Sequence, residues 1–366
     1  MHQRTSTVET YRDKLRAPIS VLFKAIVLVI ASALSGCSED SVTTRRVDEA
    51  YDFPMATRIG SRSLELSVEG ATSSRALPTD AVIVESQVVV GNARSVSLLG
   101  FGLDPPHERV PYSLRFGQGP QELEWINALV SYDGDVVALG KNNDKFVRFS
   151  TGGDFVNAGE FPWPVNAVSE SFIITGVDAA PSGPVELRPK QDSDSVVYVF
   201  DIPNALERQF RHSDEPSALG GASRVVAASD RFIALALVTD DVVGLLDTST
   251  MEERWIRILD ERRPSIQATV ERDQATSSPT KLITDIAVDK RGYVYVGRSF
   301  GIRSEHEGGL PRFQVDVYSP RLELIDTVEF VDSGTPDSIA VADGRIVIAS
   351  YLIATPTVSV YALPEY

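Results

Sequence analysis

Cysteine is nearly absent from this chain: its 366 residues contain one, Cys37. One cysteine cannot form a disulfide within the chain, nor supply the several thiolates of a Cys-based zinc site. Histidine is also scarce, and beyond residue 36 it occurs at 107, 212 and 306. These three positions lie in separate polar segments without a metal-ligand spacing, so no histidine-based metal centre is predicted.

Positive charge is under-represented as well. The chain has 35 Lys and Arg against 51 Asp and Glu, which gives a formal charge of −16. An acidic surface repels phosphate backbones, so the composition excludes nucleic acid as a partner. It also argues against polybasic binding to anionic lipid. With 43% hydrophobic and 23% charged residues, the chain is expected to be globular and long enough for a large core.

Residues 1–36 are predicted to form a cleaved secretory signal peptide. Basic residues at 12, 14, 16 and 24 precede an apolar run at 25–31, and small residues then lead to Cys37. The apolar run is too short to span a bilayer as a mature helix. The segment is therefore interpreted as an export signal.

The tetrad Leu34-Ser35-Gly36-Cys37 resembles the bacterial lipobox. The resemblance implies diacylglycerol on the Cys37 thiol, cleavage before Cys37 and acylation of the new amino terminus. Several acyl chains anchor a protein firmly, so the chain is expected to be exported and lipid-anchored to a bacterial membrane. Ser38 in place of Asp favours, by the same resemblance, the outer membrane or a periplasm-facing leaflet. Residues 37–60 are predicted to be a flexible tether.

Beyond residue 60 the sequence shows a repeat of short alternating apolar stretches broken by Gly and Asp. The second strand of each unit is predicted to begin at Gln87, Val136, Val185, Phe232, Tyr293 and Ile346. Units of about four strands, 47 to 61 residues apart, predict an all-β, six-bladed propeller of four-stranded antiparallel blades over residues 61–366. A β-sandwich, or two smaller β domains, is the alternative, but neither requires six units of similar length.

The last unit offers three strands, at 337–343, 346–352 and 358–363. A closed ring needs a fourth, which the stretch Ser63–Val68 is predicted to supply. In the third unit the strands are predicted at 172–177, 185–188, 195–201 and 206–211.

The second unit, Arg115 to Phe161, contains the turn Gly117-Gln118-Gly119-Pro120-Gln121-Glu122-Leu123. This unit resembles the repeat of bacterial six-bladed β-propeller lipoproteins of the NHL or TolB-like kind. Leu123 replaces the usual Phe, and Leu139-Gly140 replaces a common Ala-Asp. The resemblance implies the fold but no particular activity, because members include enzymes, binders and scaffolds.

Ligands of propellers usually bind at a channel entrance, which the loops between blades and between second and third strands are expected to form. The candidate ligand-binding residues on those loops are Glu122, Lys141, Asn143, Arg298, Arg303 and His306. The run 305–307, Glu-His-Glu, has metal-ligand residue types, but neighbours on an extended segment point opposite ways. Glu122 is alternatively a cap for backbone amides in a tight turn.

Two functions remain open from the sequence. The first is a binding or scaffold module, tethered by Cys37 and without a cofactor, whose channel face holds an envelope protein, peptide or glycan. The second is a metal-dependent hydrolase or lyase like the propeller lactonases, with Ca²⁺ or Zn²⁺ at the channel mouth as a Lewis acid. Lys141 and Arg298 make the expected mouth mixed or electropositive, which favours the binding module over the enzyme.

Overall fold

The computed structural model describes thirteen stretches of the chain: 43–46, 57–63, 78–92, 96–104, 107–140, 144–176, 185–200, 224–237, 242–259, 283–299, 313–330, 335–351 and 357–366. The regular structure in these stretches consists of β-strands. The chain divides into two units, residues 1–43 and 44–366, and the sheets below belong to the second. In the stretches named here, no helix has the length and hydrophobicity of a membrane span.

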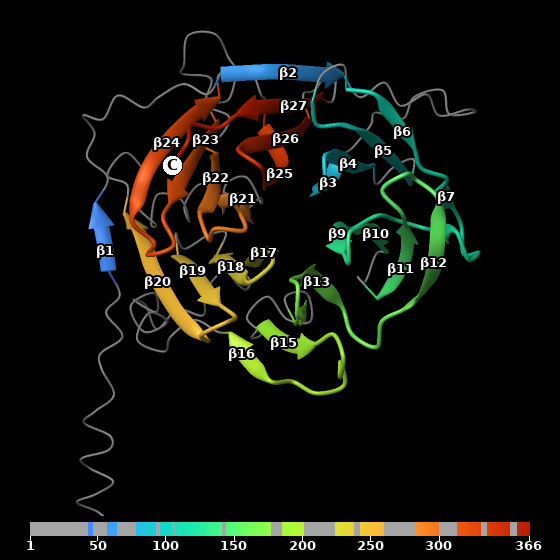
Figure 1. Cartoon of the computed structure of the whole chain (residues 1–366), viewed down its shortest axis with the longest axis horizontal. Helices are drawn as coiled ribbons and strands as arrows, with labels where there is room; N and C mark the ends of the chain where they lie inside the picture. The colour runs from blue at the N-terminus through green and yellow to red at the C-terminus, as the bar shows by residue number, and fades with distance from the viewer. Residues whose placement is uncertain are drawn as a thin grey trace, which may run out of the picture. The chain divides into compact units, whose positions relative to one another are not determined.

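Six antiparallel sheets, the blades, stand around a central axis (Figure 1). From the inside outward, blade 1 contains β3 (Pro78–Val84), β4 (Gln87–Asn92), β5 (Ser97–Gly102) and β6 (Arg109–Pro111). Blade 2 contains β9 (Ala128–Tyr132), β10 (Asp135–Leu139), β11 (Lys145–Phe149) and β12 (Phe155–Glu160). Blade 3 contains β13 (Val165–Val168), β14 (Phe172–Thr175), β15 (Val185–Pro189) and β16 (Tyr198–Phe200).

Blade 4 contains β17 (Arg224–Ala228), β18 (Phe232–Leu237), β19 (Val242–Asp247) and β20 (Glu252–Leu259), with β1 (Thr43–Arg46) next in the sheet order. Blade 5 contains β21 (Ile283–Val288), β22 (Val294–Ser299), β23 (Phe313–Tyr318) and β24 (Leu324–Phe330). Blade 6 contains β25 (Thr335–Ala342), β26 (Arg345–Tyr351), β27 (Thr357–Ala362) and β2 (Thr57–Ser63). A small parallel pair, β7 (Arg115–Phe116) and β8 (Glu122–Leu123), lies between blades 1 and 2 in the chain. The predicted six-bladed propeller is thereby confirmed.

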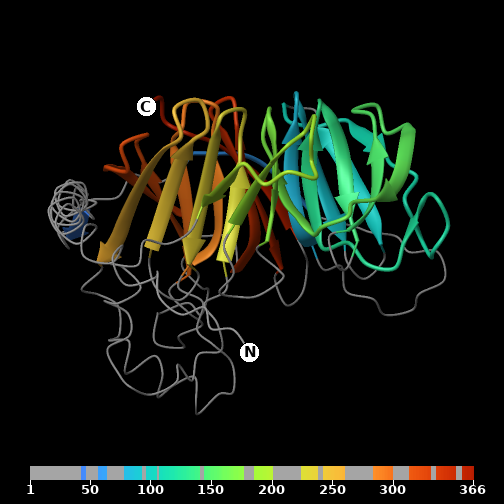
Figure 2. The same cartoon turned by 90° about the horizontal axis from the view of Figure 1, so that it is seen from below.

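The hydrophobic core lies between neighbouring blades, which stand face to face when the ring is seen from the side (Figure 2). Between blades 4 and 5, for example, Phe232 and Val243 pack in one buried cluster with Ile286 and Val296. Strand β18 is buried along its whole length because both faces of a blade are covered by its neighbours.

Two hairpin turns explain how short strands reverse so tightly. In Asp133-Gly134 and Asp343-Gly344 both residues have positive φ, between 47° and 81°. A two-residue turn of this kind matches the twist of the strands it joins, and Asp and Gly tolerate the conformation best. At these two positions the Asp and Gly residues that break the apolar stretches of the sequence thus form the turns.

The ring is closed by a strand from the start of the propeller, as predicted, but not by the predicted residues. Strand β2, Thr57–Ser63, pairs antiparallel with β27, from Thr57 opposite Ala362 to Ser63 opposite Thr357. The prediction of Ser63–Val68 was wrong because it followed apolar alternation, whereas β2 (TRIGSRS) is largely polar. Because β2 is the outermost strand of its blade, its side chains need not be apolar on both faces of the sheet. The propeller also includes Thr57–Gly60, which the sequence analysis assigned to the tether.

Blade 3 is shifted by one strand relative to the prediction. Val185 begins the third strand, β15, and not the second, which is β14. The first strand, β13, has only four residues and a register irregularity between Val165 and Ala167. So short and interrupted a strand shows no alternation in the sequence. The predicted strand at 206–211 lies outside the described residues.

A truncation tests the closure. A chain beginning at residue 57 keeps β2, whereas a chain beginning at residue 64 lacks it. We expect the shorter chain to lose about 3–6 kcal/mol of unfolding free energy, if each of six residue pairs contributes about 0.5–1 kcal/mol. Urea unfolding followed by circular dichroism measures the difference. Equal midpoints for the two chains would show that β2 does not hold the ring closed.

Candidate functional site

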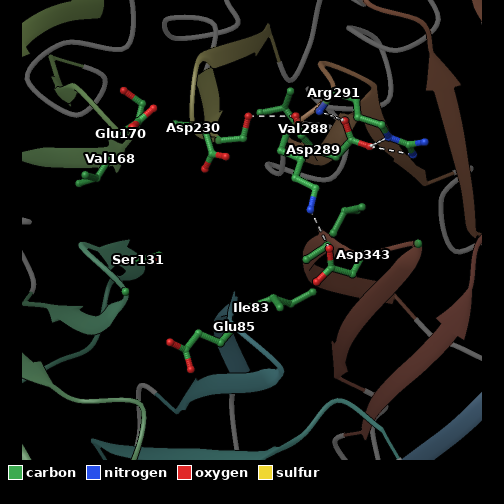
Figure 3. A pocket seen from close by; sticks show the side chains of 18 of the residues that line it. Ile83, Glu85, Ser131, Val168, Glu170, Asp230, Val288, Asp289, Arg291 and Asp343 are labelled. Atoms are coloured by element: carbon green, nitrogen blue, oxygen red, sulfur yellow. Dashed lines mark hydrogen bonds and ion pairs between the residues drawn. The ribbon is translucent and has the colours of Figure 1, made fainter.

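One end of the central channel opens into a cavity of about 750 Å³ (Figure 3). It is lined by the turns that join the first and second strands of all six blades, and by the C-terminal residues Leu363, Pro364 and Glu365. In each blade this turn follows the innermost strand, so all six turns lie next to the central axis at the same end of the channel. The cavity, called the mouth below, is thus a property of the whole ring.

Each of the six turns contributes one carboxylate to the mouth. In blade order these are Glu85, Asp133, Glu170, Asp230, Asp289 and Asp343. Three cations also line it and neutralise three of the six. Lys190 Nζ lies 2.8 Å from Asp133, Lys290 Nζ lies 3.1 Å from Asp343, and Arg291 Nη2 lies 3.1 Å from Asp289.

The other three carboxylates, on Glu85, Glu170 and Asp230, are exposed, and Figure 3 shows them around the hollow. No described Lys, Arg or His lies within ion-pair distance of them. The C-terminal Glu365 adds a further acid to the lining. Excess negative charge at a concave mouth attracts cationic groups, and this attraction weakens as salt screens it.

Beneath the mouth the channel narrows to an apolar collar. Five apolar residues line both the mouth and a deeper cavity of about 180 Å³: Ile83, Val168, Ala228, Val288 and Val341. Each comes from the innermost strand of a different blade, and Ser131 takes the corresponding place in blade 2. A group entering the mouth therefore passes these apolar side chains before it reaches the deeper cavity.

Two acids line the deeper cavity. Asp80 accepts hydrogen bonds from the backbone N–H of Leu129 at 2.7 Å and of Ala81 at 2.8 Å, and from the Ser338 hydroxyl at 2.9 Å. Burial raises the pKa of Asp80 to about 6, although these hydrogen bonds oppose the shift. Burial, aided by the charge of Asp80, raises the pKa of Asp285 to about 7.

Glu122 lies at the other end of the blades, in β8, and acts as a cap. Its carboxylate accepts a hydrogen bond from the Gly119 N–H at 2.8 Å. A side chain at Gly117, where φ is +146°, would collide with that carboxylate. The two glycines therefore let the turn close over Glu122, in agreement with the capping alternative.

Arg298 is fully buried inside blade 5 and does not face the channel. Its guanidinium pairs with Asp316, with Nε 2.7 Å from Oδ2 and Nη2 3.0 Å from Oδ1. Thr327 donates a further hydrogen bond to Asp316 at 2.8 Å. The expectation of a ligand-binding Arg298 rested on its place at the end of the second strand, which does not reveal to which side of the blade the side chain points.

The remaining candidates, Cys37, Lys141, Asn143, Arg303 and His306, lie outside the described residues. In the described stretches no group of three or more His, Cys, Asp or Glu is arranged to hold a metal ion.

The mouth was not predicted, because ligand binding was expected at the loops between blades and between second and third strands. A signal was present in the sequence. Every turn between a first and a second strand carries an acid, often followed by a small residue, as in Glu85-Ser86, Asp133-Gly134 and Glu170-Ser171. Asp80 and Asp285, which line the deeper cavity, also share a sequence signal. Each is preceded by Thr near the start of an innermost strand.

Comparison with known proteins gives the fold and no family. No family model matches the chain, and no curated protein matches its sequence. A DUF4221-family protein from Bacteroides vulgatus is similar in structure, with 11% identity, a TM-score of 0.54, and coverage of 85% of this chain and 98% of that one. A candidate exported protein from Bacteroides fragilis has 9% identity, a TM-score of 0.50, and coverage of 88% and 100%. Virginiamycin B lyase from Staphylococcus aureus reaches a TM-score of only 0.43 at 12% identity, which carries no functional argument.

The buried pair gives a test of the structural role of Arg298. Asp316→Ala removes the carboxylate that pairs with the buried Arg298 guanidinium and is expected to cost about 3–5 kcal/mol of unfolding free energy. The double variant Arg298→Met, Asp316→Leu removes both charges and should cost less. Urea unfolding measures both. An Asp316→Ala variant as stable as the wild type would mean that the pair contributes nothing to the fold.

Proposed function

We propose that this protein is an exported binding module, anchored to a bacterial membrane through a lipid on Cys37, whose propeller mouth holds a positively charged segment of an envelope protein or peptide. The observation that carries the proposal is the mouth itself. All six blades converge there on a cavity large enough for several side chains. Concave sites with a few converging polar groups are where proteins commonly bind ligands.

The charge of the mouth supports a cationic partner. Glu85, Glu170 and Asp230 are exposed and do not pair with a described cation, so they are available to lysine or arginine side chains of a partner. The three neutralised acids beside them hold Lys190, Lys290 and Arg291 in place. A partner then meets a fixed pattern of charges, which favours register and selectivity over affinity.

The envelope location is supported by the sequence of residues 1–37 and by one structural relative. The Bacteroides fragilis protein is named as a candidate exported protein, and its likeness extends over most of both chains. An anchored module needs no high affinity of its own, because tethering raises its effective concentration near partners in the same membrane.

A charge-neutral variant tests the mouth. A nine-residue lysine-rich peptide should bind the full chain at low salt, and a glutamate-rich peptide of the same length should not. Glu85→Gln combined with Glu170→Gln should weaken binding of the lysine-rich peptide roughly 2–30-fold, because each of the two exposed ion pairs contributes about 0.2–1 kcal/mol. Fluorescence anisotropy at two salt concentrations measures both effects.

The matched control is Glu124→Gln combined with Glu160→Gln. These residues are also exposed glutamates but do not line the mouth, and they change the net charge by the same amount. The control should leave affinity within about twofold, since distant charges are screened. Equal weakening in both double variants would assign the binding to overall charge and would refute a mouth site.

The anchor has its own test. In bacteria grown with a clickable fatty acid, the wild-type chain should carry the label and sediment with membranes. Cys37→Ser should lose the label and appear in the soluble fraction, because no thiol remains to be acylated. An unlabelled wild-type chain would disprove lipidation of Cys37 but would leave the proposed binding site at the mouth unaffected.

A further inference from the structure

Three consecutive junctions between blades use the same hydrogen bond. In each, a side chain near the start of an innermost strand accepts the backbone N–H of the next innermost strand around the ring. Asp285 accepts Ile339 N–H at 2.7 Å, Ser338 accepts Ala81 N–H at 3.1 Å, and Asp80 accepts Leu129 N–H at 2.7 Å. The series joins blades 5, 6, 1 and 2.

The strands that provide these side chains share a backbone irregularity. The register shifts between Ile283 and Asp285 in β21, between Pro336 and Ser338 in β25, and between Pro78 and Asp80 in β3. An extra residue in a strand turns the following side chain away from its regular direction. The bulges thus aim Asp285, Ser338 and Asp80 across the gaps between blades.

The middle member of the series links the two acids. The Ser338 hydroxyl donates to Asp80 Oδ1 at 2.9 Å, and the backbone N–H of the next residue, Ile339, donates to Asp285 at 2.7 Å. Asp80 and Asp285 are close enough for the charge of one to raise the pKa of the other. Blade 6, which carries Ser338, is the blade completed by β2 and therefore the place where the ring closes.

We propose that Asp80, Ser338 and Asp285 form a proton-dependent clasp, which holds the closing blade to both neighbours while the two carboxyl groups retain a proton and loosens when both are ionised. In the ionised state two like charges lie close together, because Asp80 and Asp285 hold the neighbouring residues Ser338 and Ile339 of blade 6. Repulsion and the need for hydration then favour wider spacing of β3, β21 and β25.

On the surrounding strands, the charged side chains that the structure describes do not line the deeper cavity with the clasp. Among the residues that line the deeper cavity, Asp80 and Asp285 are the ones that titrate. The charged residues on the strands packed against them are Asp135 in β10, Arg224 in β17, Arg298 in β22, Asp337 in β25 and Arg345 in β26. Asp135 pairs with Arg148, Arg298 with Asp316 and Arg345 with Asp104, while Arg224 does not line the cavity. The side chain of Asp337 lies outside those that the structure describes.

The sign of the pH effect follows from the two raised pKa values. With pKa values of about 6 and 7 against an ordinary 3.8, the folded chain binds more protons than the unfolded chain between pH 4 and 7. Stability from this pair is therefore fully present below about pH 4 and is lost as pH rises to about 7. Near pH 6.5 the pair carries about one negative charge, shared between its members.

The experiment uses the full chain in mild detergent at pH 5 to 8. We expect its Tm to fall by roughly 5 °C between pH 5 and pH 8 because Asp80 and Asp285 become ionised. Asp285→Asn removes one of the two charges and should reduce that fall by at least half. The matched control is Asp326→Asn in outer strand β24, where Asp326 also accepts the N–H of the next residue, Thr327. The control should keep the slope of the wild type.

Hydrogen exchange adds a local measurement. After correction for intrinsic rates, protection of the Leu129 and Ile339 amides should fall between pH 5 and 8, while amides of β18 keep theirs. Carboxyl NMR of the wild type should show two aspartates titrating near pH 6 and 7, even if a variant fails to fold. The proposal is overturned if both titrate below pH 5, if Asp285→Asn leaves the slope unchanged, or if protection at Leu129 and Ile339 is constant.

Discussion

Closure of the ring is the constraint on which the rest of this structure depends. Each blade buries its two faces only against its neighbours, so an open ring would leave a hydrophobic face on either side of the gap. The gap falls at blade 6, where three strands come from the end of the chain and β2 comes from its beginning. The β2–β27 pairing thus turns a row of sheets into a closed channel, and both cavities exist because the channel is closed.

The two regions of the channel have opposite chemistry for a physical reason. At the mouth the turns are in contact with water, so six carboxylates are tolerated and three remain available to a partner. Inside, burial raises the pKa of two carboxyl groups, which are therefore costly to ionise. The outer ring therefore suits recognition of a cation in solution, whereas the inner pair affects how the blades are held. The proposed binding site and the proposed clasp are separated by the apolar collar.

The sequence supported the fold better than the site. A strand repeat broken by Asp-Gly turns is a local signal, and it located blades 1, 2, 4, 5 and 6 through their second strands. It failed where local signals were weak: β13 is too short to alternate, and β2 is polar because it is outermost. For the site, a residue at a strand end was assumed to face the channel, yet the Arg298 side chain is fully buried and pairs with Asp316 of the neighbouring strand.

By itself the sequence determined the repeat, the number of blades, the acidic surface and the lipobox-like segment before Cys37, because each is encoded in residues close together in the chain. The tertiary structure decided which turns gather at the mouth and which acids meet. Asp80 and Ser338 are 258 residues apart in the chain, and their side chains are joined at 2.9 Å. Such a contact depends on the closure of the ring, because only closure brings the first and last blades side by side.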